Sequence, residues 1–210
     1  MAATVGHEYG QYLDSCVLSS KGYYIKKKNV KPKTLDRIKE QLIASPYDGF
    51  NTANVVTYAI HKDTPTRLYI PRFFGFDHIG RPEHRDSDFH HKEIDLSFIT
   101  TLYDYQVPAA NAVIKSIRET TGAILEAPCG LGKTAIGCKV TCDLGVKALV
   151  ISNKTFLRTQ WKEEFEMHTH AKVGLIHGDI IDVEGKDVVV CLVQTLLARQ
   201  YDQSIFEDFG

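Results

Sequence analysis

Apolar runs alternate with amphipathic segments along the second half of the chain, from about residue 96 onward. This alternation predicts a parallel sheet whose strands are joined by crossover helices. Strands are expected at residues 123–127, 147–152, 172–177 and 187–192, with helices at about 132–144 and 155–167. The runs at 147–152 and 187–192 are nearly continuous, which is typical of strands covered on both faces. Ligands of such sheets bind beyond the carboxyl ends of the strands, so functional side chains are expected there.

The first half, residues 1–95, has shorter apolar runs and frequent turn signals, which predict a small α+β domain. Strands are expected at 22–25, 55–60 and 67–70, a turn at 61–65 and an exposed polar loop at 77–95. Apolar residues at helical spacing predict a helix over residues 34–43, with Thr34 as its N-cap. The chain is therefore expected to contain two domains, at 1–95 and 96–210.

Residues 127–134 fit the pattern Gly-x-x-x-x-Gly-Lys-Ser/Thr, with Ala127 in place of the first glycine. They lie between an expected strand and an expected helix, which is the setting that a phosphate-binding loop requires. The residues of this loop are Ala127, Pro128, Cys129, Gly130, Leu131, Gly132, Lys133 and Thr134. An ordinary glycine turn before a helix is the alternative interpretation.

The residue types of this loop suit a nucleotide bound together with Mg²⁺. Backbone N–H groups at the start of a helix can cradle phosphates, and Gly130 and Gly132 let the backbone approach them closely. Lys133 can reach the β- and γ-phosphates as a point charge, and the Thr134 hydroxyl can ligate Mg²⁺. The loop alone predicts nucleotide binding and does not choose among kinases, GTPases, transporters and helicases.

Charge is distributed unevenly along the chain. The formal net charge of −1 and the isoelectric point near 6.7 do not indicate a nucleic-acid-binding protein as a whole. Between residues 21 and 39, however, eight basic residues, among them Lys26, Lys27 and Lys28, stand against Asp36 alone. With the two tyrosines among them, they could hold a phosphate backbone and stack on bases. A solvated hairpin and helix is an equally good interpretation.

Composition favours an intracellular protein. Hydrophobic residues make up 43% of the chain, enough for a substantial core. No stretch approaches the ~20 apolar residues of a membrane span, and the N-terminus lacks the pattern of a secretory signal. The five cysteines are odd in number and scattered, which favours free thiols in a reducing compartment.

Three segments around the phosphate loop carry a family resemblance. Residues 102–106 end in Gln106, whose amide could hydrogen-bond an adenine edge while Tyr103 stacks on the base. Taken alone, Gln106 would be better explained by the start of a surface helix. Residues 152–161 and 193–196 follow two of the expected strands. Together with the loop, these segments resemble the glutamine motif and motifs I, Ia and Ic of superfamily 2 helicases.

The closer resemblance is to the DEAH-type branch around the repair helicase XPB, and especially to helicases of large DNA viruses and phages. It is also carried by residues 68–75, 80–82, 185–187 and 209–210. The resemblance implies a P-loop NTPase of the α/β class. Its RecA-like parallel sheet would have helices on both faces and would follow a small α+β accessory domain. The implied function is an ATP-dependent helicase or translocase that uses ATP and Mg²⁺.

The same resemblance suggests the partners. Lys154, Arg158 and Thr195 would contact a nucleic-acid backbone, because cations and hydroxyls near helix starts suit phosphates. A solvated helix face would explain Lys154 and Arg158 as well. DNA is favoured over RNA because the relatives act on DNA, and a location in the host-cell cytoplasm or virion follows by the same analogy.

The RecA-like domain is expected to be incomplete. The sequence contains no Asp-Glu-x-His, which the family carries on the strand after a Phe-Gly like Phe209-Gly210. The carboxylates of that motif hold Mg²⁺ and orient the attacking water, and a second RecA-like domain supplies an arginine. We therefore expect hydrolysis in a complete protein and little from this chain alone. The alternatives are a catalytically incomplete, nucleotide-binding DNA-binding module, and a non-motor kinase or switch.

Overall fold

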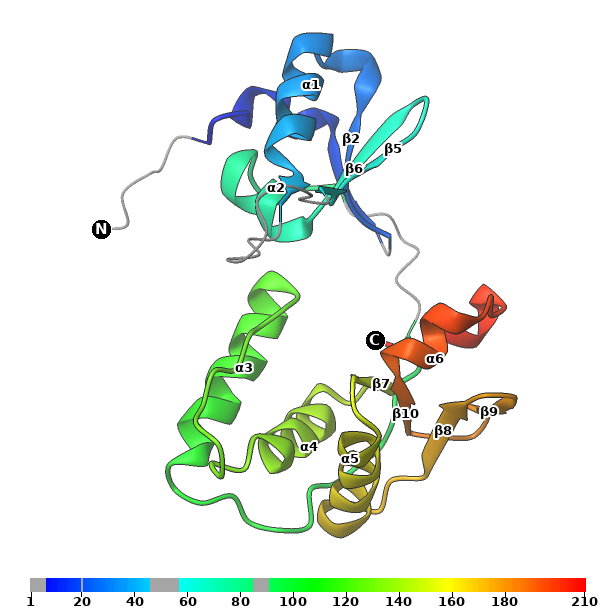
Figure 1. The fold of residues 1–210 in the computed structure, drawn as a ribbon. Helices are drawn as coiled ribbons and strands as arrows, with labels where there is room; N and C mark the ends of the chain where they lie inside the picture. The colour runs from blue at the N-terminus through cyan, green and yellow to red at the C-terminus, as the bar shows by residue number, and fades with distance from the viewer. Residues whose placement is uncertain (1–6, 20, 46–56, 85–90) are drawn as a thin grey trace, which may run out of the picture. The chain divides into compact units, whose positions relative to one another are not determined.

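The structure, a computed structural model, describes residues 7–19, 21–45, 57–84 and 91–210. Contacts divide the chain into two compact units, Met1–Phe89 (the N-terminal unit) and His90–Gly210 (the C-terminal unit). The first is coloured blue to cyan and the second green to red in Figure 1. None of the helices in the described ranges combines the length and apolar character that a membrane crossing requires.

The N-terminal unit contains an antiparallel sheet of four strands in the order β1-β2-β6-β5. Its strands are Cys16–Ser19 (β1), Gly22–Lys26 (β2), Lys62–Asp63 (β5) and Arg67–Ile70 (β6). The other elements are the α-helices Pro32–Gln41 (α1) and Arg72–His78 (α2), the 3-10 helices Gly10–Ser15 (η1) and Lys27–Asn29 (η2), and the paired strands Ile43–Ala44 (β3) and Tyr58–Ala59 (β4). The strands predicted at 22–25 and 67–70 are confirmed.

Two expectations for this unit were wrong in detail. The first helix begins at Pro32 with Lys31 at its N-cap, rather than after Thr34. Proline suits this position because its fixed φ is already helical and its missing N–H is not needed there. The turn expected at 61–65 contains the strand β5, which pairs with β6 and so shortens the turn.

Two further segments of this unit differ from what the sequence predicted. The helix α2 was not expected, and it takes the first two residues of the loop predicted at 77–95. It buries Gly75 and Phe76, so packing against the sheet stabilises a short helix that has no periodic apolar pattern of its own. Of the strand expected at 55–60, only Tyr58–Ala59 is a strand, and residues 55–56 lie outside the described ranges.

Alternation along β2 places Tyr23 and Ile25 in the core, where both are 0% exposed. The Tyr23 hydroxyl donates a hydrogen bond of 3.0 Å to the Gly80 carbonyl, which satisfies its buried polar atom. The Tyr23 ring also lies against Gly75, where an added methyl group would meet it at 2.6 Å. These contacts hold α2 firmly against the sheet.

The C-terminal unit contains the predicted sheet, with strands in the order β7-β10-β8-β9. The strands Ala148–Ser152 (β7), Val188–Leu192 (β10) and Val173–His177 (β8) are parallel, and Ile180–Asp182 (β9) forms a hairpin with β8. The helices are Gln106–Thr120 (α3), Lys133–Leu144 (α4), Thr155–His168 (α5) and Val193–Ala198 (α6), followed by the 3-10 helix Gln203–Phe206 (η3). The strands expected at 147–152, 172–177 and 187–192 and both expected helices are confirmed.

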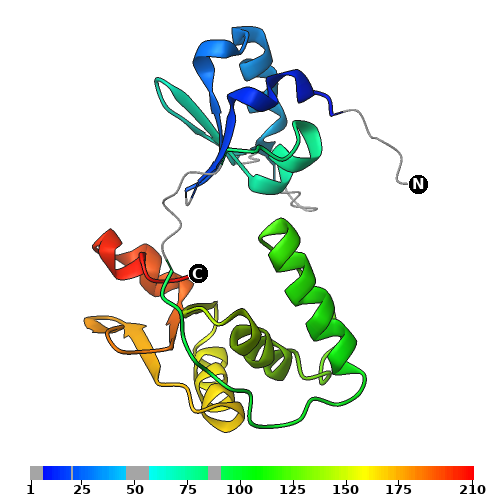
Figure 2. The ribbon, with the colours of Figure 1, turned by 180° about the vertical axis from the view of Figure 1, so that it is seen from behind.

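Both faces of the central strand β10 are covered, as its continuous apolar run predicted. Val188 packs with Cys138 of α4 and Phe165 of α5 on one face. Val189 and Cys191 pack on the other face, in a cluster with residues of α6 and η3. Figure 2 shows the extended segment between residues 91 and 105 running past α5 to reach α3.

The strand predicted at 123–127 was wrong. Residues 122–128 have no regular structure, and Ile124 is 97% exposed. An apolar run forms a strand only where a neighbouring backbone completes its hydrogen bonds. Within the described residues, the sheet offers 122–128 no pairing strand. Leu125 packs instead on a cluster of α3 and α4 that includes Ile114 and Ile136.

Candidate nucleotide-binding site

The phosphate loop ends at the first turn of α4. Gly130 and Gly132 have φ angles of 83° and 72°, a left-handed conformation that strains residues with a side chain. Gly132 is the N-cap of α4, which has no side-chain cap and no acidic residue in its first turn. The free N–H groups and the positive end of the helix dipole therefore face the loop, an arrangement that binds anions.

Lys133 folds back over this loop. Its Nζ donates hydrogen bonds to the carbonyl oxygens of Ala127 at 2.7 Å and Pro128 at 2.9 Å. The side chain thus ties the first residues of the loop to the helix that follows it. Because Lys133 is exposed, a phosphate can reach its ammonium group and take over these hydrogen bonds.

Thr134 is half-buried in the first helical turn. Its hydroxyl is a hard oxygen ligand of the kind that Mg²⁺ prefers, and Mg²⁺ commonly completes its octahedron with phosphate oxygens and water. In the part of the chain that the structure describes, no three His, Cys, Asp or Glu side chains gather into a metal site. The Thr134 hydroxyl fits a Mg²⁺ ion bound together with a nucleotide.

Gln106 connects the start of α3 to the phosphate loop. It is 4% exposed, its Oε1 accepts from the Tyr103 N–H at 2.9 Å, and its Nε2 donates to the Leu131 carbonyl at 3.0 Å. A methyl group added at Gly132 would lie 2.2 Å from Nε2, so only glycine fits beneath this side chain. The structure brings Gln106 to the loop, as the motif suggested, and its amide is hydrogen-bonded to protein atoms there.

Tyr103 offers a different surface. Its side chain is 68% exposed and stacks on Tyr105, with ring centroids 5.5 Å apart and an angle of 6° between planes. Two parallel aromatic rings near the loop can receive a flat base. The stacking role suggested for Tyr103 therefore has an accessible ring to support it.

A second group of predicted residues lies at the carboxyl ends of β7 and β10. Lys154 is the exposed N-cap of α5, Arg158 lies in the first turn of that helix, and Thr195 lies in α6. The strands pair in parallel, with Leu192 beside Ser152, so their ends lie next to one another. The structure therefore brings these three residues to one edge of the sheet, where the carboxyl ends of β7 and β10 lie.

One contact joins the two segments at this edge. The Gln194 Nε2 donates to the Asn153 carbonyl at 3.0 Å, so α6 is tied to the residue before Lys154. This pair was not predicted, because 41 residues separate its members. Arg158 carries a buried Nη1 that has no hydrogen-bond partner in the described chain.

Lys26, Lys27 and Lys28 belong to the N-terminal unit. Lys26 ends β2, and Lys27 and Lys28 begin η2. Lys27 forms an ion pair with Asp63, and its side chain is 22% exposed. Lys28 is exposed. The three neighbours therefore differ in their environments, although the sequence presented them as one run.

The cysteines differ in accessibility. Cys129 of the phosphate loop is exposed. Burial raises the pKa of Cys138 to about 12 and that of Cys142 to about 11, because the thiolate is disfavoured away from water. Cys16 and Cys191 are also buried. Cys129 is therefore the thiol through which the loop can be probed chemically.

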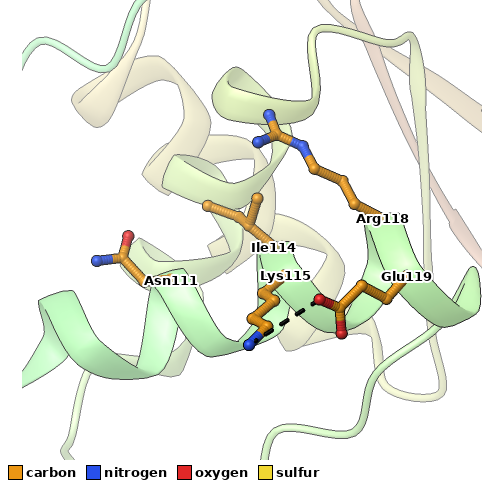
Figure 3. Close-up of a pocket in the computed structure, with 5 residues that line it drawn as sticks. All are labelled: Asn111, Ile114, Lys115, Arg118 and Glu119. Atoms are coloured by element: carbon orange, nitrogen blue, oxygen red, sulfur yellow. Dashed lines mark ion pairs between the residues drawn. The ribbon is translucent and has the colours of Figure 1, made fainter.

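Two cavities in the described part of the C-terminal unit lie along α3. The larger, of about 520 Å³, is bounded by residues 96–102, α3 and α4. The smaller, of about 320 Å³, is lined by the α3 residues Asn111, Ile114, Lys115, Arg118 and Glu119, which Figure 3 shows. Arg118 donates to the Asp143 carbonyl near the end of α4 at 3.1 Å. Neither cavity includes a residue of the phosphate loop, where Lys133 covers the backbone.

Comparisons with known proteins agree with this geometry. Residues 99–209 match the family model described as "Type III restriction enzyme, res subunit". A protein of Acanthamoeba polyphaga mimivirus, provisionally named an ATP-dependent RNA helicase, is 29% identical over 195 residues. That alignment covers 90% of this chain and 37% of the viral protein, so the chain spans little more than a third of that relative.

Two cellular relatives match a shorter part. The Drosophila melanogaster "General transcription and DNA repair factor IIH helicase/translocase subunit XPB" is 32% identical over 83 residues, 40% of this chain and 10% of that protein. The "DNA 3'-5' translocase XPB2" of Sulfurisphaera tokodaii is 32% identical over 88 residues, 42% of this chain and 19% of that protein. These matches confirm the resemblance to XPB-type and viral helicases that the motifs predicted.

Proposed function

We propose that this chain, which belongs to the family described as "Type III restriction enzyme, res subunit", is the ATP-binding part of an ATP-dependent helicase or translocase. The observation that carries the proposal is the loop at 127–134. There, left-handed glycines, an uncapped helix start and the Lys133 ammonium group converge. This combination suits a polyphosphate better than any other ligand class.

The roles of the loop residues follow from their contacts. Lys133 exchanges its hydrogen bonds to Ala127 and Pro128 for bonds to phosphate oxygens, while the N–H groups of residues 130–134 hold the same phosphates. Thr134 would hold Mg²⁺, which neutralises charge on the phosphates when bound. Tyr103 stacks on the base, and Gln106 either reads the adenine edge or keeps the loop in its binding shape.

A nucleic-acid strand would lie across the edge formed by Lys154, Arg158 and Thr195. The position of these residues at helix starts supports this proposal, because phosphate is a strong acceptor for cations and hydroxyls. The viral relative is named for RNA and the two XPB-type relatives for DNA. We favour DNA, because the sequence resembles the DNA helicases of the XPB branch.

Hydrolysis requires more than the described site supplies. The sequence contains no Asp-Glu-x-His, so carboxylates that would orient the attacking water are not identified in it. We propose that the chain binds ATP and hydrolyses it poorly by itself. This observation also favours the second candidate function, a nucleotide-binding and catalytically incomplete DNA-binding module.

Titration of the chain with Mg·ATP tests the nucleotide site. Lys133→Ala should weaken binding about 10- to 100-fold, because hydrogen bonds to charged groups are worth roughly 1.5–3 kcal/mol. Lys139→Ala is the matched control: it lies on the same helix and pairs with Asp143, away from the loop. Equal affinities for the two variants would reject the assigned role of Lys133.

A second titration tests the nucleic-acid edge. Arg158→Gln should weaken binding of single-stranded DNA and reduce the salt dependence of log K by about 1, as expected for one lost phosphate contact. Lys162→Gln removes a charge from the same helix at a side chain that is 55% exposed and pairs with Glu166. If both variants bind like the wild type, Arg158 does not contact the strand.

A further inference from the structure

The seven basic residues between positions 26 and 39 fall into two groups. Lys27 and Lys39 both pair with Asp63, which holds η2, α1 and β5 together. Arg37 pairs with Glu8, which ties α1 to the start of the unit. The charges of this first group are thus neutralised by partners within the unit. They build its structure and are not available to a second anion.

The second group consists of Lys26, Lys28, Lys31 and Lys33, and we call it the basic ridge. Among the described residues, none of its members has an ion-pair partner. Lys26 is half-buried at the end of β2, and the other three are exposed on η2 and the start of α1. Four uncompensated positive charges therefore follow one another within eight residues of chain.

The position of the ridge is electrostatically unfavourable for the protein alone. The helix α1 has no side-chain cap and no acidic residue in its first turn, and Lys31 and Lys33 stand at this positive end of the helix dipole. Cations at this end of a helix are destabilising, because they meet the positive end of its dipole. Unfavourable local arrangements of this kind are expected at functional sites. An anionic ligand bound here would make the positive charge favourable.

The overall charge follows the same division. Residues 1–89 contain 13 Lys and Arg against 10 Asp and Glu, whereas residues 90–210 contain 12 against 16. The excess of positive charge in the chain is thus confined to the unit that carries the ridge. A polyanion approaching the chain is attracted to this unit.

The surroundings of the ridge select the kind of polyanion. No large apolar side chain is exposed on the described residues between 7 and 42. A membrane surface would need apolar side chains to insert beside the lysines, and a protein partner would need an apolar anchor at the interface core. Lysines on a segment without exposed apolar side chains suit a nucleic-acid backbone, and the exposed apolar side chains of this unit come after α1 in the chain.

We propose that the basic ridge is a nucleic-acid-binding site of the N-terminal unit that works without ATP. The proposal rests on the proposed function only in that the chain acts on nucleic acid. It adds Lys31 and Lys33 to the contacts predicted from the sequence and removes Lys27, whose charge is used by Asp63. The ridge holds phosphates without reading bases, because lysine side chains act there as point charges.

The test is a salt titration of the whole chain with labelled DNA of about 20 nucleotides, as single strand and as duplex, without nucleotide. The ridge variant carries Lys28→Gln, Lys31→Gln and Lys33→Gln, which spares the strand residue Lys26. It should bind at least about tenfold more weakly near 0.1 M salt, and the slope of log K against log salt should fall by about 3.

A control variant with Lys115→Gln, Lys162→Gln and Lys172→Gln loses the same charge at exposed sites outside the N-terminal unit. It should keep the wild-type slope. Equal losses in the two variants would overturn the proposal, since only the net charge would then matter. A ridge variant that binds like the wild type would overturn it as well. Thermal unfolding of both variants shows that they are folded.

Two further arms separate this site from its alternatives. The ridge variant should bind Mg·ATP with the wild-type affinity, so failure of the nucleotide site and failure of the ridge are distinguishable. Polyglutamate and vesicles rich in anionic lipid should compete weakly with DNA. If either binds as tightly as DNA and loses its binding in the ridge variant, the ridge recognises that partner and the nucleic-acid proposal is wrong.

Discussion

The two units differ in how completely their apolar segments are enclosed. In the N-terminal unit all four residues of β1 are buried, and Ile25 of β2 is 0% exposed. In the C-terminal unit the apolar segment 122–128 leads into the phosphate loop without a pairing strand, and Ile124 is 97% exposed. The nucleotide chemistry therefore lies beside the least enclosed segment of its unit. Ligand-binding segments are commonly drawn from such regions of low local stability.

The largest expected effect separates the two isoleucines. Ile25→Ala should reduce the free energy of unfolding of the N-terminal unit by about 2–5 kcal/mol, because it empties a fully buried site. Ile124→Ala should change stability by no more than about 0.5 kcal/mol, because water already surrounds that side chain. Hydrogen exchange resolved by peptide measures both units in one experiment. A large cost at Ile124 would contradict the difference in enclosure.

Two glycines, one in each unit, allow the comparison to be tested through effects of intermediate size on stability. Gly75→Ala should destabilise the N-terminal unit by about 1–3 kcal/mol, because its methyl group would strike the Tyr23 ring, which the bond to Gly80 holds in place. Gly137→Ala meets the Trp161 ring at 2.5 Å, but Trp161 is half-buried and can move. The second cost should be smaller, with a shift in the fluorescence of this one tryptophan of the chain. The reverse order of costs would contradict this account.

The smallest expected effect concerns Asp63. Hydrogen bonds from Lys27, and then from Lys39, hold the pKa of this carboxyl below its usual value of 3.8. A lowered pKa stabilises the folded unit above the unfolded value and loses this contribution as the pH falls through the folded value. Asp63→Asn should therefore cost about 0.5 kcal/mol at neutral pH, because the pairs are partly exposed. The difference should vanish once the pH has fallen below the folded pKa. A cost that is independent of pH would show that the ion pairs do not cause it.

The same comparison explains which features could be predicted from the sequence. The run at 187–192 became the buried strand β10 because the segments that pair with it and cover it also lie in the chain. The run at 123–127 also has neighbouring apolar residues, Ile124 and Leu125, yet apolarity does not provide hydrogen-bond partners, and no strand pairs with it in the described part. Helix α2 was missed because its stability comes from contact with Tyr23, a tertiary effect.

The candidate site, too, could be predicted from the sequence only in part. The residue types of the loop predicted its position before α4, since glycines, a lysine and a threonine at fixed spacing carry that information locally. The motif did not show that Lys133 bonds to Ala127 and Pro128, or that Gln106 bonds to Leu131. It also presented Lys27 as equivalent to its neighbours, although Asp63 lies far along the chain and becomes its partner only in the folded unit.

The central claim is that the loop at 127–134 holds the phosphates of a nucleotide, and Cys129 provides the most direct measurement. This thiol is exposed, whereas the raised pKa values of Cys138 and Cys142 make those thiols slow to react. The rate at which a thiol reagent modifies Cys129 is measured by mass spectrometry, with and without Mg·ATP. We predict that Mg·ATP slows the reaction in the wild type and not in Lys133→Ala. An unchanged rate in the wild type at saturating Mg·ATP would contradict the claim.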